Sequence, residues 1–406
     1  MANEKLSKAK KEKNDEFYTQ FADISREIEA YLEYNPDTFR GKVVLLPCDD
    51  PEWSNFTLYF AQNFDRLGLK KLISTSYAYE SKRLKLPYQP TLFESESEIF
   101  DLSKSATKGK IFTLSHDITG DGKVDHKDLE WDYLEGDGDF RSEEVTRLRD
   151  EADIIVTNPP FSLFREFFAW VTTASKQFIM IANTNAITYK EVFPLIASNK
   201  MWLGNGFYKG NAYFETPFAD KYGNGVLNSE TGLVKFRNCC WFTNLDHGRR
   251  HQPLELMTMA DNLKYSKHKE IRENGYPKYD NYDAIEVAFT DAIPSDYDGV
   301  MGVPISFLDK YCPEQFEIVA FRKGDDGKDL IYSTLAGGGT AILPNTHTKN
   351  CDIQQQMGIE PMSTEKENLQ EFSFATSIMG LMNNPKDTMV NGKSKYARIT
   401  IRRIKK

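Results

Sequence analysis

The chain has 406 residues, with 40% hydrophobic and 13% aromatic side chains, which is enough for two domains or one enlarged α/β domain. Its formal net charge of −9 excludes a uniformly basic coat, so any contact with nucleic acid has to come from local basic patches. No apolar stretch approaches the roughly 18 residues of a membrane span, and the charged N-terminus lacks the apolar segment of a secretion signal. The five cysteines show no zinc-binding spacing, and together these features predict a cytoplasmic protein without a metal site.

Helical and strand patterns alternate along the first half of the chain. The expected helices cover residues 23–34, 53–67, 143–151 and 161–174, and the expected strands cover residues 43–46, 71–75, 153–157 and 177–182. Gly68 is the expected stop of the second helix. This alternation predicts a parallel, doubly wound α/β sheet, in which ligands bind at the carboxyl edge of the strands.

The most informative motif is Asn158-Pro159-Pro160-Phe161, which stands directly behind the β-branched strand at 153–157. Two prolines hold the turn rigid, and the Asn158 side-chain oxygen and the Pro159 carbonyl can accept the two hydrogens of a planar amino group. These contacts free the nitrogen lone pair for in-line attack on a sulfonium methyl, while Phe161 offers a flat face to a base taken out of the stack. The alternative is a plain strand-ending turn, because Asn and Pro are common turn residues.

Acidic residues near the ends of the predicted strands are candidates for binding S-adenosylmethionine. Asp49 and Asp50 follow the first strand, where carboxylates can receive the ammonium or ribose hydroxyls of this cofactor. Asp139 and Phe140 can accept from its adenine amino group and cover the adenine ring. Each pair also has a simpler interpretation, because Asp49 and Asp50 can cap the next helix and a Gly-Asp run is a common turn.

Basic residues gather in the middle of the chain and at both ends. The middle patch interleaves with aromatic and histidine residues and contains the best candidates for phosphate contacts, which are Arg249, Arg250, Lys264, Lys267 and Lys269. The first thirteen and the last fourteen residues are also rich in Lys and Arg. For each patch the alternative is an ordinary solvated surface or a frayed terminus.

Two further segments have ambiguous patterns. Residues 117–128 fit an EF-hand calcium loop only in part and lack a clear pair of flanking helices, which favours an acidic surface loop. Residues 324–386, with a short helix expected near 374–382, fit target-site recognition or DNA clamping, and equally an inert surface insertion.

Several motifs together resemble the EcoRI-type adenine-specific DNA methyltransferases. The resemblance rests on residues 15–20, 48–51, 54–56, 136–142 and 158–166, and it continues through residues 279–285, 302–311, 315–318 and 391–399. It therefore covers nearly the whole chain.

The resemblance implies a Rossmann-like methyltransferase with a catalytic domain at residues 1–245 and a C-terminal target-recognition, DNA-binding region at 246–406. The methyl group of S-adenosylmethionine would go to N6 of an adenine flipped out of a short duplex DNA site. The implied cofactor contacts are Phe17, Tyr18 and Thr19 over the methionine end, Asp49 and Asp50 in the first-strand loop, and Asp139 and Phe140 at the adenine. The first-strand loop departs from most such enzymes because it lacks a glycine-rich run.

The interpretation adopted is a monomeric, site-specific adenine-N6 DNA methyltransferase, with a cognate restriction endonuclease as a possible partner at the same site. Two alternatives stay open, since the Asn-Pro-Pro-aromatic turn suits any planar amino nitrogen. One is a methyltransferase for adenine N6 in RNA or for the amide nitrogen of protein glutamine. The other is a catalytically inactive DNA-binding relative.

Overall fold

The computed structural model divides the chain into two compact units. Unit 1 comprises residues 1–191 and 201–249, and unit 2 comprises residues 192–200 and 250–406. The residues that the structure describes are 17–48, 54–78, 97–217, 219–223, 225–322, 330–334, 340–344, 388–391, 393–395 and 397–405. Residues 192–200, which the sequence placed in the catalytic domain, belong to unit 2.

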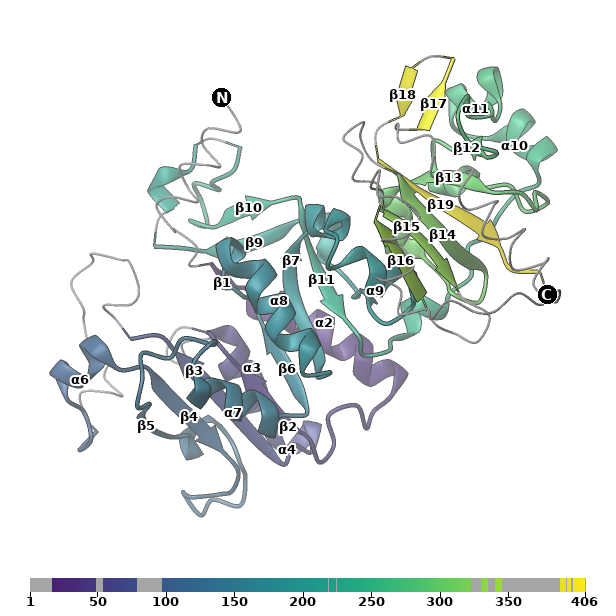
Figure 1. Cartoon of the computed structure of the whole chain (residues 1–406). Coiled ribbons are helices and arrows are strands. Elements are labelled where there is room, and N and C mark those ends of the chain that lie inside the picture. The colour runs from purple at the N-terminus through teal and green to yellow at the C-terminus, as the bar shows by residue number, and fades with distance from the viewer. Residues whose placement is uncertain are drawn as a thin grey trace, which may run out of the picture. The chain divides into compact units, whose positions relative to one another are not determined.

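Unit 1 is built on an eight-stranded mixed sheet in the order β5-β4-β3-β2-β6-β7-β11-β8 (Figure 1). The strands are β2 (Val43–Leu46), β3 (Lys71–Ser76), β4 (Lys110–Leu114), β5 (Glu130–Tyr133), β6 (Ile154–Thr157), β7 (Gln177–Asn183), β8 (Trp202–Leu203) and β11 (Cys239–Thr243). The four central strands, β3, β2, β6 and β7, are parallel, as the sequence predicted. The flanking strands β4, β5, β11 and β8 run antiparallel to their neighbours, so the sheet is not purely parallel.

Helices cover both faces of this sheet, which confirms the α/β class. The helices are α2 (Phe21–Tyr34), α3 (Asn55–Gln62), α4 (Phe64–Leu67), α6 (Leu102–Thr107), α7 (Glu143–Glu151) and α8 (Phe164–Thr173). Apolar side chains of α2 and α3 pack with alternate residues of the central strands, such as Val44, Leu46 and Val156. In Figure 1, α7 and α8 lie in front of the sheet, with α2 and α3 behind it.

Local backbone chemistry explains where the observed helices differ from the expected ones. The helix expected at 53–67 is broken at Asn63 into α3 and α4, and it ends at Gly68, whose φ of 64° is the left-handed conformation that glycine adopts readily. The helix expected at 161–174 begins with a 3-10 turn, Phe161–Leu163, directly behind the two prolines. The backbones of Pro160, with a ψ of 119°, and of Leu163 are not α-helical, so the α-helix proper starts at Phe164.

A second, three-stranded sheet in unit 1 has the order β1-β9-β10. Its strands are β1 (Tyr18–Thr19), β9 (Ala212–Glu215) and β10 (Val234–Phe236). Tyr18 pairs with Glu215 and Thr19 with Phe214, so this sheet joins the start of the described chain to residues nearly 200 positions later.

Unit 2 contains a six-stranded sheet in the order β12-β13-β19-β14-β15-β16, and a separate hairpin, β17-β18. The strands are β12 (Ile285–Glu286), β13 (Met301–Pro304), β14 (Phe316–Arg322), β15 (Leu330–Thr334), β16 (Thr340–Pro344), β17 (Thr388–Val390), β18 (Lys393–Lys395) and β19 (Arg398–Arg403). The helices of this unit are α9 (Phe193–Ala197), α10 (Met259–Tyr265) and α11 (Lys269–Asn274). The basic C-terminal segment is not a frayed end, because β19 pairs with both β13 and β14 and buries Ile399 and Ile401.

The remaining helical segments are 3-10 turns. They are η1 (His126–Asp128), η2 (Phe161–Leu163), η3 (Thr184–Thr188), η4 (Tyr208–Gly210), η5 (Ala219–Lys221), η6 (Gly248–His251), η7 (Thr290–Ala292) and η8 (Ile305–Lys310). Within the described residues, every helix is too short or too polar to cross a membrane.

The acidic segment 117–128 is a tightly bonded loop between β4 and β5. The Asp117 carboxylate accepts hydrogen bonds from the Gly120 and Gly122 amides at 2.6 and 2.8 Å. The Asp128 carboxylate accepts from the amides of Ile118, Thr119 and Asp125, and these bonds lower the pKa of Asp128 to about 2. The two carboxylates therefore organise the loop's own backbone.

Candidate active site

The Asn158 turn leaves the carboxyl end of β6, in the middle of the central sheet. The strand is buried along its whole length. Its last residue, Thr157, donates a 2.6 Å hydrogen bond to the carbonyl of Pro47, the residue that follows β2 in the chain. Pro159 is buried, while Asn158 and Phe161 are partly exposed. The motif thus follows a fully buried central strand, at the edge where an open α/β sheet binds its ligands.

The Asn158 side chain is held in one orientation. Its Nδ2 donates a 2.8 Å hydrogen bond to the Phe17 carbonyl, and exchanging the two ends of the amide would set oxygen against oxygen. Its Oδ1 is buried and has no hydrogen-bond partner among the residues that the structure describes. Buried acceptors are rarely left unpaired, so this oxygen marks a place for a ligand's N–H donor.

Phe161 lies beside an aromatic cluster centred on Phe17. The two ring centroids are 6.0 Å apart and the rings are tilted by 34°. Phe17 also contacts the rings of Phe214 at 5.8 Å and Phe236 at 5.2 Å, which belong to β9 and β10. The second sheet therefore positions both the carbonyl that holds Asn158 and the ring beside Phe161.

The predicted residues Phe17, Tyr18 and Thr19 all lie in or next to β1. The Thr19 carbonyl accepts a 2.8 Å hydrogen bond from Asn55 Nδ2, which fixes β1 to the first turn of α3. The Thr19 hydroxyl is buried and, like Asn158 Oδ1, has no hydrogen-bond partner within the described part of the chain. The structure therefore brings Phe17 to the Asn158 turn, and Thr19, two residues further along the chain, carries a second unpaired polar atom.

The loop at 136–140 is pressed against the end of β3, the neighbour of β2. Gly138 has a φ of 83°, and a Cβ at this position would lie 2.2 Å from the Ser76 carbonyl oxygen. The Ala78 amide donates a 2.8 Å hydrogen bond to the Asp137 carbonyl, which holds the loop there. Glycine is required at 138 for this close approach.

Asp139 and Phe140 have different surroundings in this loop. The Asp139 carboxylate accepts hydrogen bonds from the Arg141 guanidinium at 2.9 and 2.6 Å, and this guanidinium also binds Glu166 at 2.7 Å. The Phe140 ring is fully buried against Phe167 and Trp170, with centroids 5.2 and 5.6 Å away. Phe140 is therefore a core residue here, and this placement does not match the prediction that it covers a ligand ring.

Sequence reasoning missed Tyr77 in this part of the fold. It follows β3 directly, and burial raises the pKa of its hydroxyl, with the neighbouring Cys48 and Asp139 adding to the effect. Its signal in the sequence is an aromatic residue immediately after a buried strand. Asp49 and Asp50, the predicted residues of the first-strand loop, lie outside the described residues.

The predicted DNA contacts fall into two groups. Arg250 is buried and its guanidinium bonds to Asn199, so the structure corrects its prediction as a phosphate contact. Arg249 is partly buried and donates to the Asn205 carbonyl. The three lysines are exposed on or beside α10 and α11, where Lys267 pairs with Asp291 at 2.6 Å and Lys269 with Glu273 at 3.4 Å, while Lys264 lies over the Tyr265 ring.

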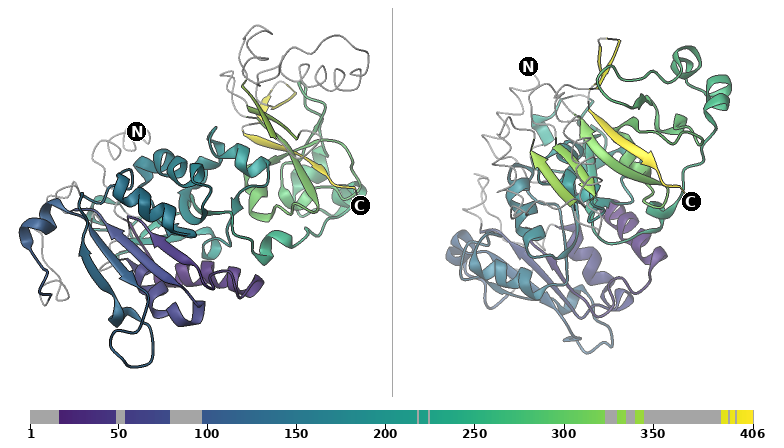
Figure 2. Two further views of the ribbon diagram at one scale, coloured as in Figure 1. Left: turned by 60° about the horizontal axis from the view of Figure 1, so that its bottom comes forward. Right: turned by 45° about the vertical axis from the view of Figure 1, so that its right-hand side comes forward.

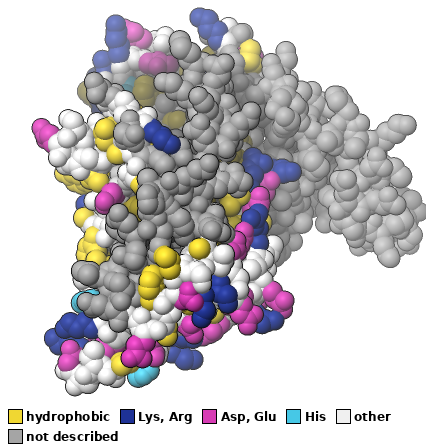
Figure 3. Space-filling view, turned by 90° about the vertical axis from the view of Figure 1, so that its left-hand side faces the viewer, with side chains coloured by type: hydrophobic (Ala, Val, Ile, Leu, Met, Phe, Trp, Pro, Cys, Tyr) yellow, Lys and Arg dark blue, Asp and Glu magenta, His cyan; other side chains and the backbone are white. Residues whose placement is uncertain are grey.

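Charges of both signs are mixed on one face of the described surface. On the face drawn in Figure 3, dark-blue and magenta side chains alternate over the lower part, without a continuous basic area among the described residues. An affinity for DNA therefore depends on particular residues rather than on an overall field.

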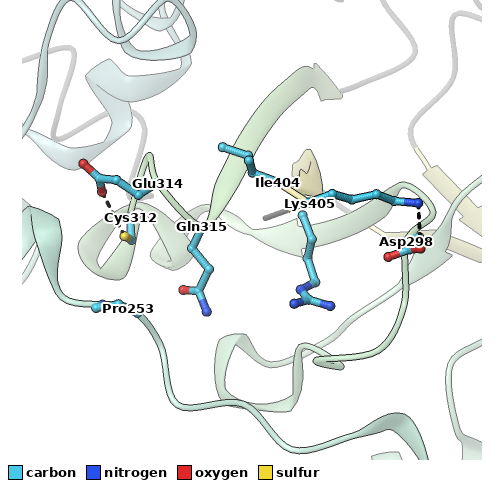
Figure 4. Close-up of a pocket in the computed structure, with 8 residues that line it drawn as sticks. Pro253, Asp298, Cys312, Glu314, Gln315, Ile404 and Lys405 are labelled. Carbon is cyan, nitrogen blue, oxygen red and sulfur yellow. Dashed lines mark hydrogen bonds and ion pairs between the residues drawn. The ribbon is translucent and has the colours of Figure 1, made fainter.

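Unit 2 also contains a cavity of about 460 Å³ (Figure 4). Its walls include Cys312, whose thiol lies 3.1 Å from a Glu314 oxygen, and Lys405, which pairs with Asp298 at 2.9 Å. None of the site residues predicted from the sequence is among the described residues that line this cavity.

Comparisons with known proteins identify the family. A family model described as adenine-specific methyltransferase EcoRI matches residues 5–404. The type II methyltransferase M.EcoRI of Escherichia coli is 46% identical over 331 residues, which are 81% of this chain and 92% of that protein. M.MpnI of Mycoplasma pneumoniae is 34% identical over 77% of this chain and 84% of its own length, and M.MgeORF184P of Mycoplasma genitalium is 33% identical over 77% and 85%. No solved structure matches the chain.

The α/β fold and the polar turn behind its central strand are those of an enzyme with its site at the sheet's carboxyl edge. The chain belongs to the EcoRI family of adenine-specific methyltransferases. It is a site-specific adenine DNA methyltransferase, which confirms the activity that the resemblance implied.

Proposed function

We propose that this enzyme transfers the methyl group of S-adenosylmethionine to N6 of an adenine that is flipped out of a short duplex DNA site. Unit 1 is the Rossmann-like catalytic part, and unit 2 is the target-recognition region. The enzyme acts as a monomer, and a cognate restriction endonuclease shares its site. The observation that carries the proposal is the buried, unpaired and oriented Oδ1 of Asn158.

The Asn158 turn activates the amino group without a strong base. Asn158 Oδ1 accepts one N6 hydrogen and the Pro159 carbonyl accepts the other, which draws the nitrogen lone pair out of conjugation with the ring. The bound cofactor supplies an electrophilic sulfonium methyl to this lone pair. Methyl transfer leaves N6 positively charged, and one N6 proton then passes to solvent. Because the tether to Phe17 fixes the amide before substrate arrives, little reorganisation is needed in the transition state.

The residues around the turn fit the cofactor. Phe17 contacts Asn158 through its carbonyl, and the unpaired Thr19 hydroxyl lies two residues further along the chain, so this segment is proposed to hold the cofactor's methionine end. Asp139, in the loop at 136–140, is the proposed partner of the cofactor's adenine amino group, because an ionised carboxylate accepts hydrogen bonds and Arg141 holds this one in place. Asp49 and Asp50 complete the proposed set in the loop after β2.

Phosphate contacts are assigned to Lys264, Lys267 and Lys269, with Arg249 as a further candidate. The three lysines are exposed on or beside one helical pair of unit 2. Lys267 and Lys269 pair with solvent-accessible carboxylates, so phosphates can replace those partners at low cost. These contacts hold the duplex, while base flipping brings the adenine to Asn158.

Substitutions at Asn158 and Phe161 test the proposal. Asn158→Ala should abolish methyl transfer and leave DNA and cofactor binding largely intact, because its hydrogen bond strengthens as N6 becomes tetrahedral. Asn158→Asp should also be inactive, since it sets a carboxylate oxygen against the Phe17 carbonyl. Asn35→Ala, at the exposed end of α2, is the matched control and should keep full activity.

Phe161→Ala should cause a partial loss, because base–aromatic stacking contributes about 1–3 kcal/mol. The loss should shrink when the target adenine sits in a mismatch, which is easier to extrude. Single-turnover rates on matched and mismatched duplexes measure both effects. Full activity of Asn158→Ala would overturn the proposal, and equal relative losses on the two duplexes would remove Phe161 from base flipping.

A further inference from the structure

The hairpin β17-β18 stands apart from the sheets of unit 2. Figure 1 and the right-hand view of Figure 2 show its two short strands, in yellow, rising clear of the six-stranded sheet. The strands pair in antiparallel register, with Val390 opposite Lys393. Asn391 and Lys393 are exposed at this end of the hairpin.

Hydrogen bonds of β17 and Asn391 fix the hairpin to the loop that precedes β12. The Asp280 amide donates to the Met389 carbonyl at 2.7 Å, and Asn281 Oδ1 accepts from the Met389 amide at 3.0 Å. An Asp280 carboxylate oxygen accepts from the Asn391 amide at 3.2 Å. Val390 is buried in a small cluster with tyrosines of the same loop. The hairpin is therefore anchored to this loop through β17 and the Asn391 amide.

The hairpin also lies beside the helical pair that carries the predicted phosphate contacts. Lys395 of β18 pairs with Glu270 of α11 at 3.9 Å. Glu270 is next in sequence to Lys269, and α11 follows α10, which contains Lys264. Two segments more than 100 residues apart thus place exposed lysines on one edge of unit 2.

We propose that the β17-β18 hairpin is a base-reading element, which enters the major groove and contacts base edges through Asn391 and Lys393. The inference rests on the proposed function, in which duplex DNA is the substrate. A two-stranded ribbon fits the major groove, where Asn makes a paired contact with adenine and Lys with guanine. The lysines of α10 and α11 bind phosphates beside the groove, and an anchored hairpin loses little conformational freedom on binding.

Asn391 also has a conformational role, and the test has to separate the two roles. Its φ of 50° is left-handed, a conformation that Asn and Gly tolerate better than other residues. Asn391→Gly keeps this conformation accessible and removes only the side chain. A purely structural Asn391 therefore predicts no change in sequence preference for this variant, whereas a base-reading Asn391 predicts a change at one position of the site.

The experiment methylates a library of duplexes of random sequence in vitro and locates N6-methyladenine by sequencing. Wild type, Asn391→Gly and Lys393→Ala are compared, with Lys127→Ala as the matched control, because it removes an exposed lysine from a loop of unit 1. Asn391→Gly and Lys393→Ala should each relax the preference at one base pair by roughly 5- to 150-fold, while Lys127→Ala keeps the wild-type preference.

Two results would overturn the inference. One is an unchanged preference in both hairpin variants at wild-type rates, and the other is an even loss of methylation across all sequences. Absence of N6-methyladenine with the wild-type enzyme would instead refute the proposed function, so the two failures are distinguishable. Thermal unfolding of each variant shows whether an even loss comes from a damaged fold.

Discussion

Glu27 on α2 offers the sharpest test of how unit 1 is held together. Its side chain is fully buried, and its carboxylate accepts three hydrogen bonds. They come from the amides of Asn205 and Gly206, both at 2.9 Å, and from the Tyr31 hydroxyl at 2.7 Å. This carboxylate therefore fastens the loop after β8 to helix α2.

Glu27→Ala removes the acceptor for all three donors and opens a cavity. Each buried donor left unpaired costs about 1–3 kcal/mol, although water entering the cavity recovers part of this, so the free energy of unfolding should fall by about 3–5 kcal/mol. Glu27→Gln is the matched variant. The Gln oxygen can still accept from Asn205 and Tyr31, but the Gln amide nitrogen faces the Gly206 N–H, so that two donors oppose each other. The free energy of unfolding should therefore fall by about 1–3 kcal/mol.

Chemical denaturation with urea measures both losses, and its pH dependence adds a separate check. Burial raises the pKa of Glu27 above its usual value of 4.5, against the opposing effect of the Tyr31 hydrogen bond. The folded state then holds this proton more tightly than the unfolded state, so the wild type should lose stability as pH rises from about 4.5 through the raised pKa. Glu27→Gln should lack this fall. A loss below about 1 kcal/mol in Glu27→Ala would refute the anchoring role.

Two further predictions concern the ligands. Asp139→Ala should raise the dissociation constant of S-adenosylmethionine by roughly 5- to 150-fold, because the variant loses a hydrogen bond to the cofactor. The control is Glu166→Ala, which removes the other partner of Arg141 and should leave this constant unchanged. Wild-type binding of Asp139→Ala in calorimetry would show that the Gly-Asp run is only a turn. Changing Lys264, Lys267 and Lys269 to Ala should reduce the log–log salt slope of DNA binding by about one for each phosphate that the variant no longer binds. The control variant changes three exposed lysines of unit 1, Lys104, Lys123 and Lys127, to Ala. It should keep the wild-type salt slope. An unchanged slope in the first variant would place the DNA elsewhere.

The centre of unit 1 was predictable because its sequence signals are local. The strand at 43–46 is a uniform apolar run, the strand at 71–75 begins soon after the glycine stop of a helix, and the helix at 143–151 has a clear N-cap. Each of them ends within a residue of its predicted position. Ser142, for example, accepts from the Val145 amide, which fixes the start of the helix at the residue after it. The Asn158 motif was found for the same reason, since strand and turn are contiguous.

The parts missed by sequence reasoning depend on distant pairing. More buried and less buried residues alternate along β4 and β5. Both segments are strands because β4 pairs with β3 and β5 pairs with β4. β19 looked like a basic tail, yet it lies between β13 and β14, where Ile399 and Ile401 are buried. The structural role of Arg250 likewise follows from its bond to Asn199, 51 positions away, which no local pattern reveals.

The bond between Asn158 and the Phe17 carbonyl has a consequence for biosynthesis. The two residues are 141 positions apart, and Phe17 is itself held by β9 and β10, which leave the ribosome later still. Pairings across such long separations form slowly, and a growing chain folds from its N-terminus. A nascent chain can therefore complete its central parallel strands long before Asn158 is fixed in place. Translation that stops before residue 212 would leave the central parallel strands with an unsecured catalytic amide, so premature fragments should be unable to modify DNA.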